Sequence, residues 1–235
     1  MPDQVGHDEG VSGMTIYFYI FVGNNHIPPM FRFFAILTAW MLLCAFKPVF
    51  TAEPIPPRVE ARMRGNSYPE SGAAISLDEL RYLRLSYYDF NGVPQTGEMV
   101  CNAAIAQDLL EIFEALFEAE YPIRSIRLVD DFGASDDASM LADNTSCFNY
   151  RLVPGQSNMS RHALGMAVDV NPFENPYIDT KGVIRPPEAA RYVDRAQDFP
   201  HKIDREDLCC RLFRAHGFNW GGGWARSKDY QHFQK

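Results

Sequence analysis

The clearest hydrophobic pattern in the chain is a helical period that follows Asn102. Apolar residues recur there at three- and four-residue spacing, at Ile105, Leu109, Ile112, Leu116 and Phe117. Asn102 is a favourable amino-terminal cap and Pro122 cannot continue a helix, so the pattern predicts a helix between these two residues. A second helix is predicted over residues 205–216, because Gly217 follows it as a stop signal.

Shorter apolar segments predict strands elsewhere in the chain. They lie at residues 98–101, 126–129, 148–151 and 166–170. The stretch 130–144 is dense in Asp, Ser and Gly, and we expect it to be a loop. Because strands and helices follow one another without a regular alternation, we expect an α+β domain.

The amino-terminal region has the pattern of a targeting signal. Arg32 precedes an apolar run over residues 33–46, and Lys47 and Pro48 end it. The run is shorter than the roughly 20 apolar residues that a membrane-spanning helix needs. We therefore interpret residues 30–52 as a signal peptide that is cut after Ala52, and we expect no stable membrane span after this cleavage. Such a protein would be exported to the periplasm or cell envelope.

Residues 1–29 precede this signal. Because Met30 by itself begins a complete signal peptide, we interpret residues 1–29 as an upstream extension or the result of a mis-assigned start. A long polar region that belongs to the signal is the alternative. Residues 53–73 are rich in Pro, Arg and Gly without a hydrophobic period, which predicts a linker or surface arm. We assign residues 74–235 to one folded domain.

Composition and charge narrow the functional classes. With 46% hydrophobic residues, the 235-residue chain can bury one core. Its formal net charge of -8 and its lack of a basic cluster argue against nucleic acid as a partner, because binding to phosphates needs a basic face. In an oxidising compartment, Cys101 and Cys147 are predicted to form a disulfide if their two strands are neighbours; the alternative is that they are small buried hydrophobic residues.

One candidate site motif spans residues 160–169, with the sequence Ser-Arg-His-Ala-Leu-Gly-Met-Ala-Val-Asp. In a strand, alternate residues face opposite sides, so Asp169 lies on the face opposite Val168. A fully extended chain would place His162 roughly 23 Å from Asp169. The two side chains meet only if the chain turns between them, and Gly165 can supply that turn.

A second motif, Asp229-Tyr230-Gln231-His232, adds an imidazole and a carboxylate near the carboxy terminus. A catalytic zinc ion keeps three protein ligands and one open position. His162, Asp169 and His232 make such a set, which predicts one Zn²⁺ per chain. Asp229 then remains near the metal as a base for the attacking water.

Together these residues resemble the D-alanyl-D-alanine carboxypeptidase and L-alanyl-D-glutamate endopeptidase family of zinc peptidases. The family pattern is Ser-x-His, then Gly-x-Ala-x-Asp, then an acidic residue three positions before a final His. Residues 160, 162, 165, 167, 169, 229 and 232 match it in order and spacing. The resemblance covers about residues 96–235. It implies a hedgehog/DD-peptidase-like fold, in which helices flank a small, mostly antiparallel sheet.

The resemblance also implies roles for individual residues. His162, Asp169 and His232 would be the zinc ligands and Asp229 the general base. The Tyr150-Arg151 pair resembles the family's Tyr-Arg, whose arginine contacts the substrate and stabilises charge on the attacked carbonyl. An ordinary surface arginine at a strand end is the alternative.

Ser160 would bind substrate or orient its loop, although a serine near a turn is often only a local cap. The glycines at residues 221–223 would let the backbone pass close to the substrate.

The implied function is hydrolysis of an amide bond in the stem peptides of peptidoglycan. Both D-Ala-D-Ala carboxypeptidase and L-Ala-D-Glu endopeptidase activities are possible, and Asp rather than Glu at position 229 favours the endopeptidase branch. The alternatives are a zinc-bearing binding module of the same fold without catalysis, and a peptidase with a substrate outside the cell wall. An open ligand set together with an unused acidic residue argues against the binding module.

Overall fold

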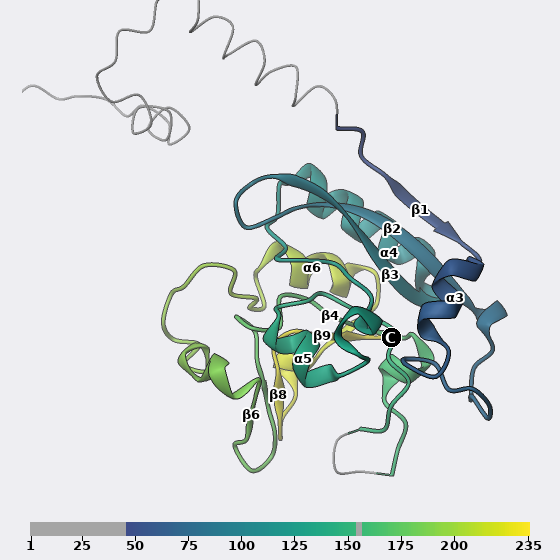
Figure 1. The fold of residues 1–235 in the computed structure, drawn as a ribbon. Helices are drawn as coiled ribbons and strands as arrows, with labels where there is room; N and C mark the ends of the chain where they lie inside the picture. Colours follow the sequence, from purple (N-terminus) through teal and green to yellow (C-terminus); the bar gives the residue numbers. More distant parts are fainter. Residues whose placement is uncertain (1–45, 154–156) are drawn as a thin grey trace, which may run out of the picture. The chain divides into compact units, whose positions relative to one another are not determined.

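The computed structural model describes residues 46–153 and 157–235 (Figure 1). Its strands and helices are β1 (Phe50–Glu53), α3 (Pro57–Met63), β2 (Leu80–Tyr88), β3 (Pro94–Asn102), α4 (Ala103–Glu118), α5 (Asp136–Leu141), β4 (Ala167–Asp169), β5 (Tyr177–Ile178), β6 (Ile184–Arg185), α6 (Leu208–Ala215), β7 (Asn219–Trp220), β8 (Lys228–Asp229) and β9 (His232–Gln234). Within this described part, no helix is long and apolar enough to cross a membrane. Most of the predicted signal peptide, residues 30–45, and the upstream segment 1–29 lie outside the described residues.

Three small antiparallel sheets and a few helices make up the described unit. The strand orders are β1-β2-β3, β4-β9-β7 and β6-β5-β8. The α4 helix packs on the first sheet, and its apolar face forms a core with residues of β2, β3, α6 and β9 (Figure 1). This mixture confirms the predicted α+β class.

The α4 helix begins and ends where the sequence pattern predicts. Asn102 accepts a hydrogen bond of 2.9 Å from the backbone N–H of Ala104, which satisfies one of the free donors at the helix start. Ile105, Leu109 and Ile112 are fully or almost fully buried, as expected of the apolar face.

Residues 50–73 differ from the predicted signal-peptide end and linker. Phe50–Glu53 pair with β2 as an edge strand, and the ring of Phe50 lies 5.8 Å from that of Phe117 on α4. Pro57–Met63 form α3, in which Val59 and Met63 are fully buried in a second core cluster. Only these two apolar positions face the core in a seven-residue helix, too few to produce a recognisable hydrophobic period.

The region between α4 and β4 also differs from the predicted elements. The expected strand over residues 126–129 is reduced to one bridge between Ile126 and Thr145, and a 3-10 turn begins at Val129. The predicted loop over residues 130–144 contains α5, whose first turn is capped by the Ser135 hydroxyl. The segment 148–151 forms no regular strand.

The cysteine expectation is corrected as well. Cys101 and Cys147 are free thiols, both almost completely buried. The Cys147 thiol points to the carbonyl oxygen of Gly165 at 3.4 Å, and burial raises the pKa of both thiols. The two residues therefore act as small buried hydrophobic side chains, the alternative interpretation given above.

Candidate metal centre

The pairing of β4 with β9 brings two of the predicted metal ligands together. Asp169 and His232 are directly opposite each other in the antiparallel register. Val168 and Phe233, the neighbouring pair, are fully buried in the main core. Because side chains alternate along a strand, Asp169 and His232 share the opposite face and point away from this core.

A tight turn carries His162 to the same place. Arg161–Leu164 form a 3-10 turn that Ser160 caps by accepting the backbone N–H of His162 at 3.2 Å. Gly165 ends the turn at a φ of 64°, in the left-handed region. A Cβ atom there would lie 2.6 Å from the backbone nitrogen of Asn102, so only glycine fits the turn against the start of α4.

The three side chains meet around one point. The Nε2 atom of His162 lies 3.2 Å from Nδ1 of His232 and 3.2 Å from Oδ2 of Asp169. The second carboxylate oxygen, Oδ1, lies 2.9 Å from Nδ1 of His232. All three residues are buried, with exposed fractions of 3% to 7%.

Outer hydrogen bonds orient both imidazole rings. Nδ1 of His162 lies 2.6 Å from the carbonyl oxygen of Cys147, and Nε2 of His232 lies 3.0 Å from the amide oxygen of Gln234. Because both partners are acceptors, each outer nitrogen must donate a proton. The inner nitrogens are thereby directed at the shared point, the arrangement typical of metal-binding histidines.

The charges of the three side chains shift one another's pKa values. Burial alone would raise the pKa of Asp169, but the charge and hydrogen bonds of His162 and His232 outweigh it and hold the pKa far below its usual value. For His232, burial would lower the pKa, whereas the hydrogen bond and charge of Asp169 raise it to about 9. The Asp169 carboxylate therefore favours the charged form of the His232 ring.

The donor set fits a zinc ion. Zinc bonds of about 2.0–2.1 Å in tetrahedral geometry separate neighbouring ligand atoms by about 3.3 Å. The separations of 3.2 Å between the two inner histidine nitrogens and 3.2 Å between Nε2 of His162 and Oδ2 of Asp169 are close to this value. Two imidazoles and a carboxylate are also the ligand types that a catalytic zinc site uses. His162, Asp169 and His232 thus form a group that can hold a metal ion.

Asp229 lies beside this group without belonging to it. Its Oδ2 atom is 4.0 Å from Nδ1 of His232, and its buried Oδ1 atom has no hydrogen-bond partner among the described residues. Burial, together with the negative charges of Asp169 and Asp136, raises the pKa of Asp229 to about 7, although His232 opposes the shift. Gly221 permits this position, because a Cβ atom there would lie 2.7 Å from the Asp229 carbonyl oxygen.

The region that holds these residues is similar to a known protein family. The family model described as D-alanyl-D-alanine carboxypeptidase matches residues 154–235. The chain is similar to that family over this stretch. No curated protein and no solved structure gives a significant match to the chain.

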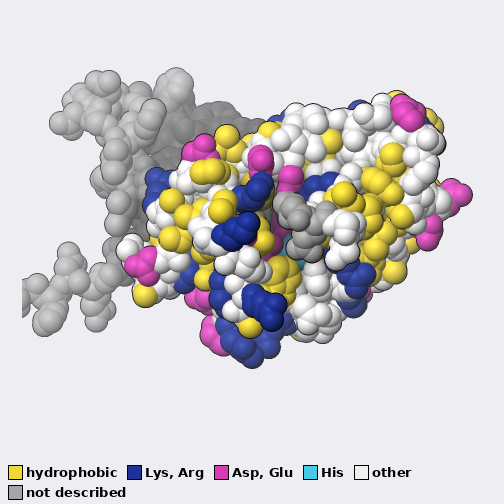
Figure 2. Space-filling view, turned by 90° about the horizontal axis from the view of Figure 1, so that it is seen from below, with side chains coloured by type: hydrophobic (Ala, Val, Ile, Leu, Met, Phe, Trp, Pro, Cys, Tyr) yellow, Lys and Arg dark blue, Asp and Glu magenta, His cyan; other side chains and the backbone are white. Residues whose placement is uncertain are grey.

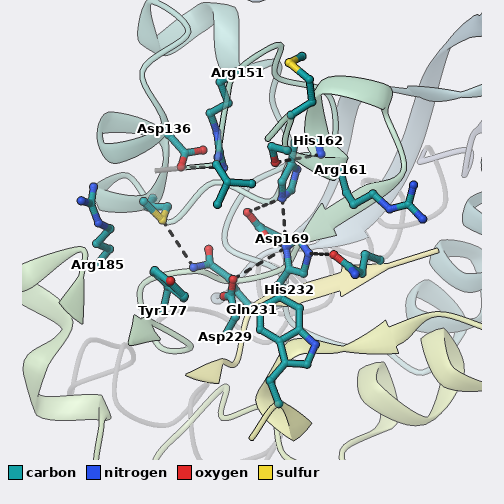
Figure 3. Close-up of a pocket in the computed structure, with 16 residues that line it drawn as sticks. Asp136, Arg151, Arg161, His162, Asp169, Tyr177, Arg185, Asp229, Gln231 and His232 are labelled. Carbon is teal, nitrogen blue, oxygen red and sulfur yellow. Dashed lines mark hydrogen bonds and ion pairs between the residues drawn. The ribbon is translucent and has the colours of Figure 1, made fainter. Parts of the chain in front are cut away.

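The match to the carboxypeptidase family includes Ser160, the three clustered residues and Asp229. Arg151 lies outside the matched stretch, and only its contacts in the structure bear on its role. Its Nη2 atom forms an ion pair of 2.8 Å with Asp136 on α5, and its buried Nε atom has no hydrogen-bond partner among the described residues. Figure 3 shows Arg151 and Asp136 on one side of the histidine cluster and Asp229 on another.

The predicted site residues line one cavity of about 170 Å³. Seen from outside, it is a hollow in which histidine and acidic side chains are visible between basic ones (Figure 2). Besides the predicted residues, the walls include Asp136, Tyr177, Arg185, Gln234 and Trp224. The ring of Trp224 lies 5.4 Å from that of His232.

Sequence reasoning missed Asp136, Tyr177, Arg185 and Gln234. Gln234 could have been found, because it lies two residues after His232 and a strand therefore places both on one face. The other three lie on elements of two to six residues, which are too short for a periodic signal.

Proposed function

We propose that this protein is an exported zinc peptidase that hydrolyses an amide bond in the stem peptides of peptidoglycan. The observation that carries the proposal is the convergence of His162, Asp169 and His232 on one point, with the buried carboxylate of Asp229 beside them. The family match over the same region supports peptidase activity. An apolar run after Arg32 supports export, which a wall hydrolase requires.

In this proposal His162, Asp169 and His232 hold one zinc ion. When bound, the zinc supplies Lewis-acid polarisation of the scissile carbonyl and lowers the pKa of the attacking water. Cys147 and Gln234 keep both imidazoles oriented toward the site through the hydrogen bonds described above.

Asp229 acts as the general base. It takes a proton from the attacking water and delivers it to the leaving amine. The carboxylate form is required for this step, and burial opposes that form in the free chain. Asp229 ionises more readily next to a bound cation, because an opposite charge favours the carboxylate.

Arg151 stabilises the charge that develops on the attacked carbonyl oxygen. Its guanidinium lines the cavity, where Asp136 holds it by the 2.8 Å ion pair. A preoriented cation at this point lowers the barrier because it need not reorganise during the reaction. Ser160 orients the His162 turn through its cap and also faces the cavity, where it contacts substrate.

Digestion of purified muropeptides by the zinc-loaded protein, followed by mass spectrometry, tests the proposal. Loss of one terminal D-Ala identifies a carboxypeptidase, and separation of L-Ala from D-Glu identifies an endopeptidase. The Asp229→Asn variant and the chelator-treated protein are the controls, and both should leave the muropeptides intact. Full zinc occupancy with no cleavage of any muropeptide would contradict the proposal and favour a binding module.

A further inference from the structure

The walls of the metal cavity continue beyond it. Helix α5 and the β5-β6 hairpin each contribute residues to this cavity, among them Asp136 and Arg185. The same helix and hairpin also line a second cavity of about 390 Å³, through Leu141, Val183 and Ile184. Arg185 lines both cavities, so the two adjoin at this side chain, and we refer to them together as the groove. In Figure 3, Arg185 lies at the outer side of the metal cavity.

An exposed ion pair marks the boundary between the two cavities. Nη1 of Arg185 lies 3.3 Å from Oδ1 of Asp137 on α5, and these side chains are 37% and 69% exposed. Exposed ion pairs contribute little to stability, because water competes for both partners. A ligand that passes along the groove can therefore displace this contact at small cost.

The second cavity has a largely apolar lining, in which Asp137, Arg185 and Glu188 are the charged residues. In the described part of the chain, four large hydrophobic side chains are exposed, and Leu141 at 49% and Val183 at 47% are two of them. Both line this cavity, together with the rings of Pro186 and Pro187. Clustered exposed hydrophobic residues mark binding sites more often than isolated ones do.

The metal cavity is too small to hold a peptide substrate alone. Its volume of about 170 Å³ lies below the roughly 300–1,000 Å³ of pockets that bury a drug-sized ligand. It therefore has room only for the groups next to the scissile bond, and the rest of a bound peptide would lie outside this cavity.

We propose that the cavity lined by Leu141, Val183 and Ile184 is an accessory subsite that binds an aliphatic side chain of the peptide substrate, at a residue away from the scissile bond. This inference rests on the proposed peptidase function, because the occupant is the same peptide that the metal centre cuts. Continuity through Arg185 and the apolar lining support this occupant.

The subsite is tested with pairs of peptides that share the scissile bond and differ at one other position, which is either Leu or Gly. In successive pairs this position lies one residue farther from the scissile bond, on either side of it. At one position, the wild type should prefer Leu by about tenfold or more in kcat/KM, a typical discrimination for an apolar pocket. Val183→Ser and Leu141→Ser should each reduce the preference for Leu to less than about threefold, mainly through a higher KM for the Leu peptide.

Val93→Ser is the matched control. Val93 is 48% exposed, lies between β2 and β3, and lines neither cavity, so its replacement should keep the preference for Leu. Equal kcat/KM for both peptides at every position, or a preference that survives both substitutions, would overturn the subsite.

Calorimetric binding of the same peptides separates this inference from the proposed function. If no peptide is cut, the proposed function fails. The subsite is still supported if the Leu peptide binds more tightly than the Gly peptide and if Val183→Ser abolishes this difference. Equal binding of both peptides overturns it. If sedimentation shows a dimer that the Val183→Ser substitution dissociates, the cavity binds a second copy of the chain. This result would also overturn the proposal.

Discussion

The Nε2 atom of His162 lies 3.2 Å from the Nδ1 atom of His232, although 70 positions separate the two residues in the chain. Each ring is held from behind by an acceptor, and both inner nitrogens contact the same Asp169 carboxylate. Two electron-donating nitrogens at this distance repel each other unless a proton or a cation lies between the side chains.

Replacement of Asp229 should separate catalysis from metal binding. We expect Asp229→Asn to keep the zinc and the fold but to lose roughly 10²- to 10⁴-fold in turnover, the usual effect of removing a positioned general base. The amide keeps the shape of the side chain and cannot accept the proton. Steady-state kinetics on a cleaved muropeptide, together with zinc analysis, measure both properties.

Asp198→Asn is the control for this variant, because the Asp198 side chain is fully exposed and lies outside the cavity. Its turnover should equal that of the wild type. If Asp229→Asn lost its zinc, Asp229 would be a ligand; if it kept both zinc and turnover, the base would lie elsewhere.

Gln234 should contribute to zinc affinity without touching the metal. It accepts the outer proton of His232 at 3.0 Å and thereby directs the inner nitrogen at the site. We expect Gln234→Ala to weaken zinc binding by about 10- to 100-fold, as removal of such outer partners does. Competition with a chelator of known affinity measures the change. Gln107→Ala, at an exposed position of α4, is the control, and an equal affinity in both variants would argue against the role of Gln234.

The motif from His162 to Asp169 was accessible from the sequence because its spacing is local, whereas adding His232 relied on ligand chemistry and on the family resemblance. The interval from His162 to Asp169 needs a turn, and Gly165 is the residue that supplies it at a φ of 64°. Likewise, α4 is long enough to show its period, and Asn102 and Pro122 mark its ends.

The residues around the site were not predictable in the same way. Asp136 meets Arg151, and Arg185 meets Asp137, only after separate segments have packed. The elements that carry them are short, so tertiary contacts rather than local pattern decide their structure. For Cys101 and Cys147 the predicted disulfide was wrong. The two residues lie in neighbouring segments, but they remain free thiols.

A buried acid pair outside the site should make stability depend on pH. Glu174 and Asp143 are 8% and 7% exposed, and they are hydrogen-bonded to each other. Burial, followed by the charge of Asp143, raises the pKa of Glu174 to about 8. The folded state therefore holds a proton that the unfolded chain releases near its ordinary pKa of about 4.3.

Because the folded state binds this proton more tightly than the unfolded chain does, the free energy of unfolding decreases as pH rises. The stabilisation is complete below about pH 4.3 and is lost as pH rises toward 8, at a slope of up to about 1.4 kcal/mol per pH unit. Urea unfolding at pH 5 and pH 8 should show this decrease in the free energy of unfolding, and Glu174→Gln should remove most of it. Glu188→Gln, at an exposed position, should keep the decrease; a slope unaffected by Glu174→Gln would show that another group causes it.

Zinc content per chain tests the central claim most directly. The protein is purified without added metal and analysed by elemental mass spectrometry beside His162→Ala and His216→Ala. The control residue His216 lies 3.3 Å from Asp108 and is not part of the cluster. We predict one zinc per chain in the wild type and in His216→Ala, and much less in His162→Ala. Equal zinc content in all three proteins would contradict the assignment of His162, Asp169 and His232 as the metal centre.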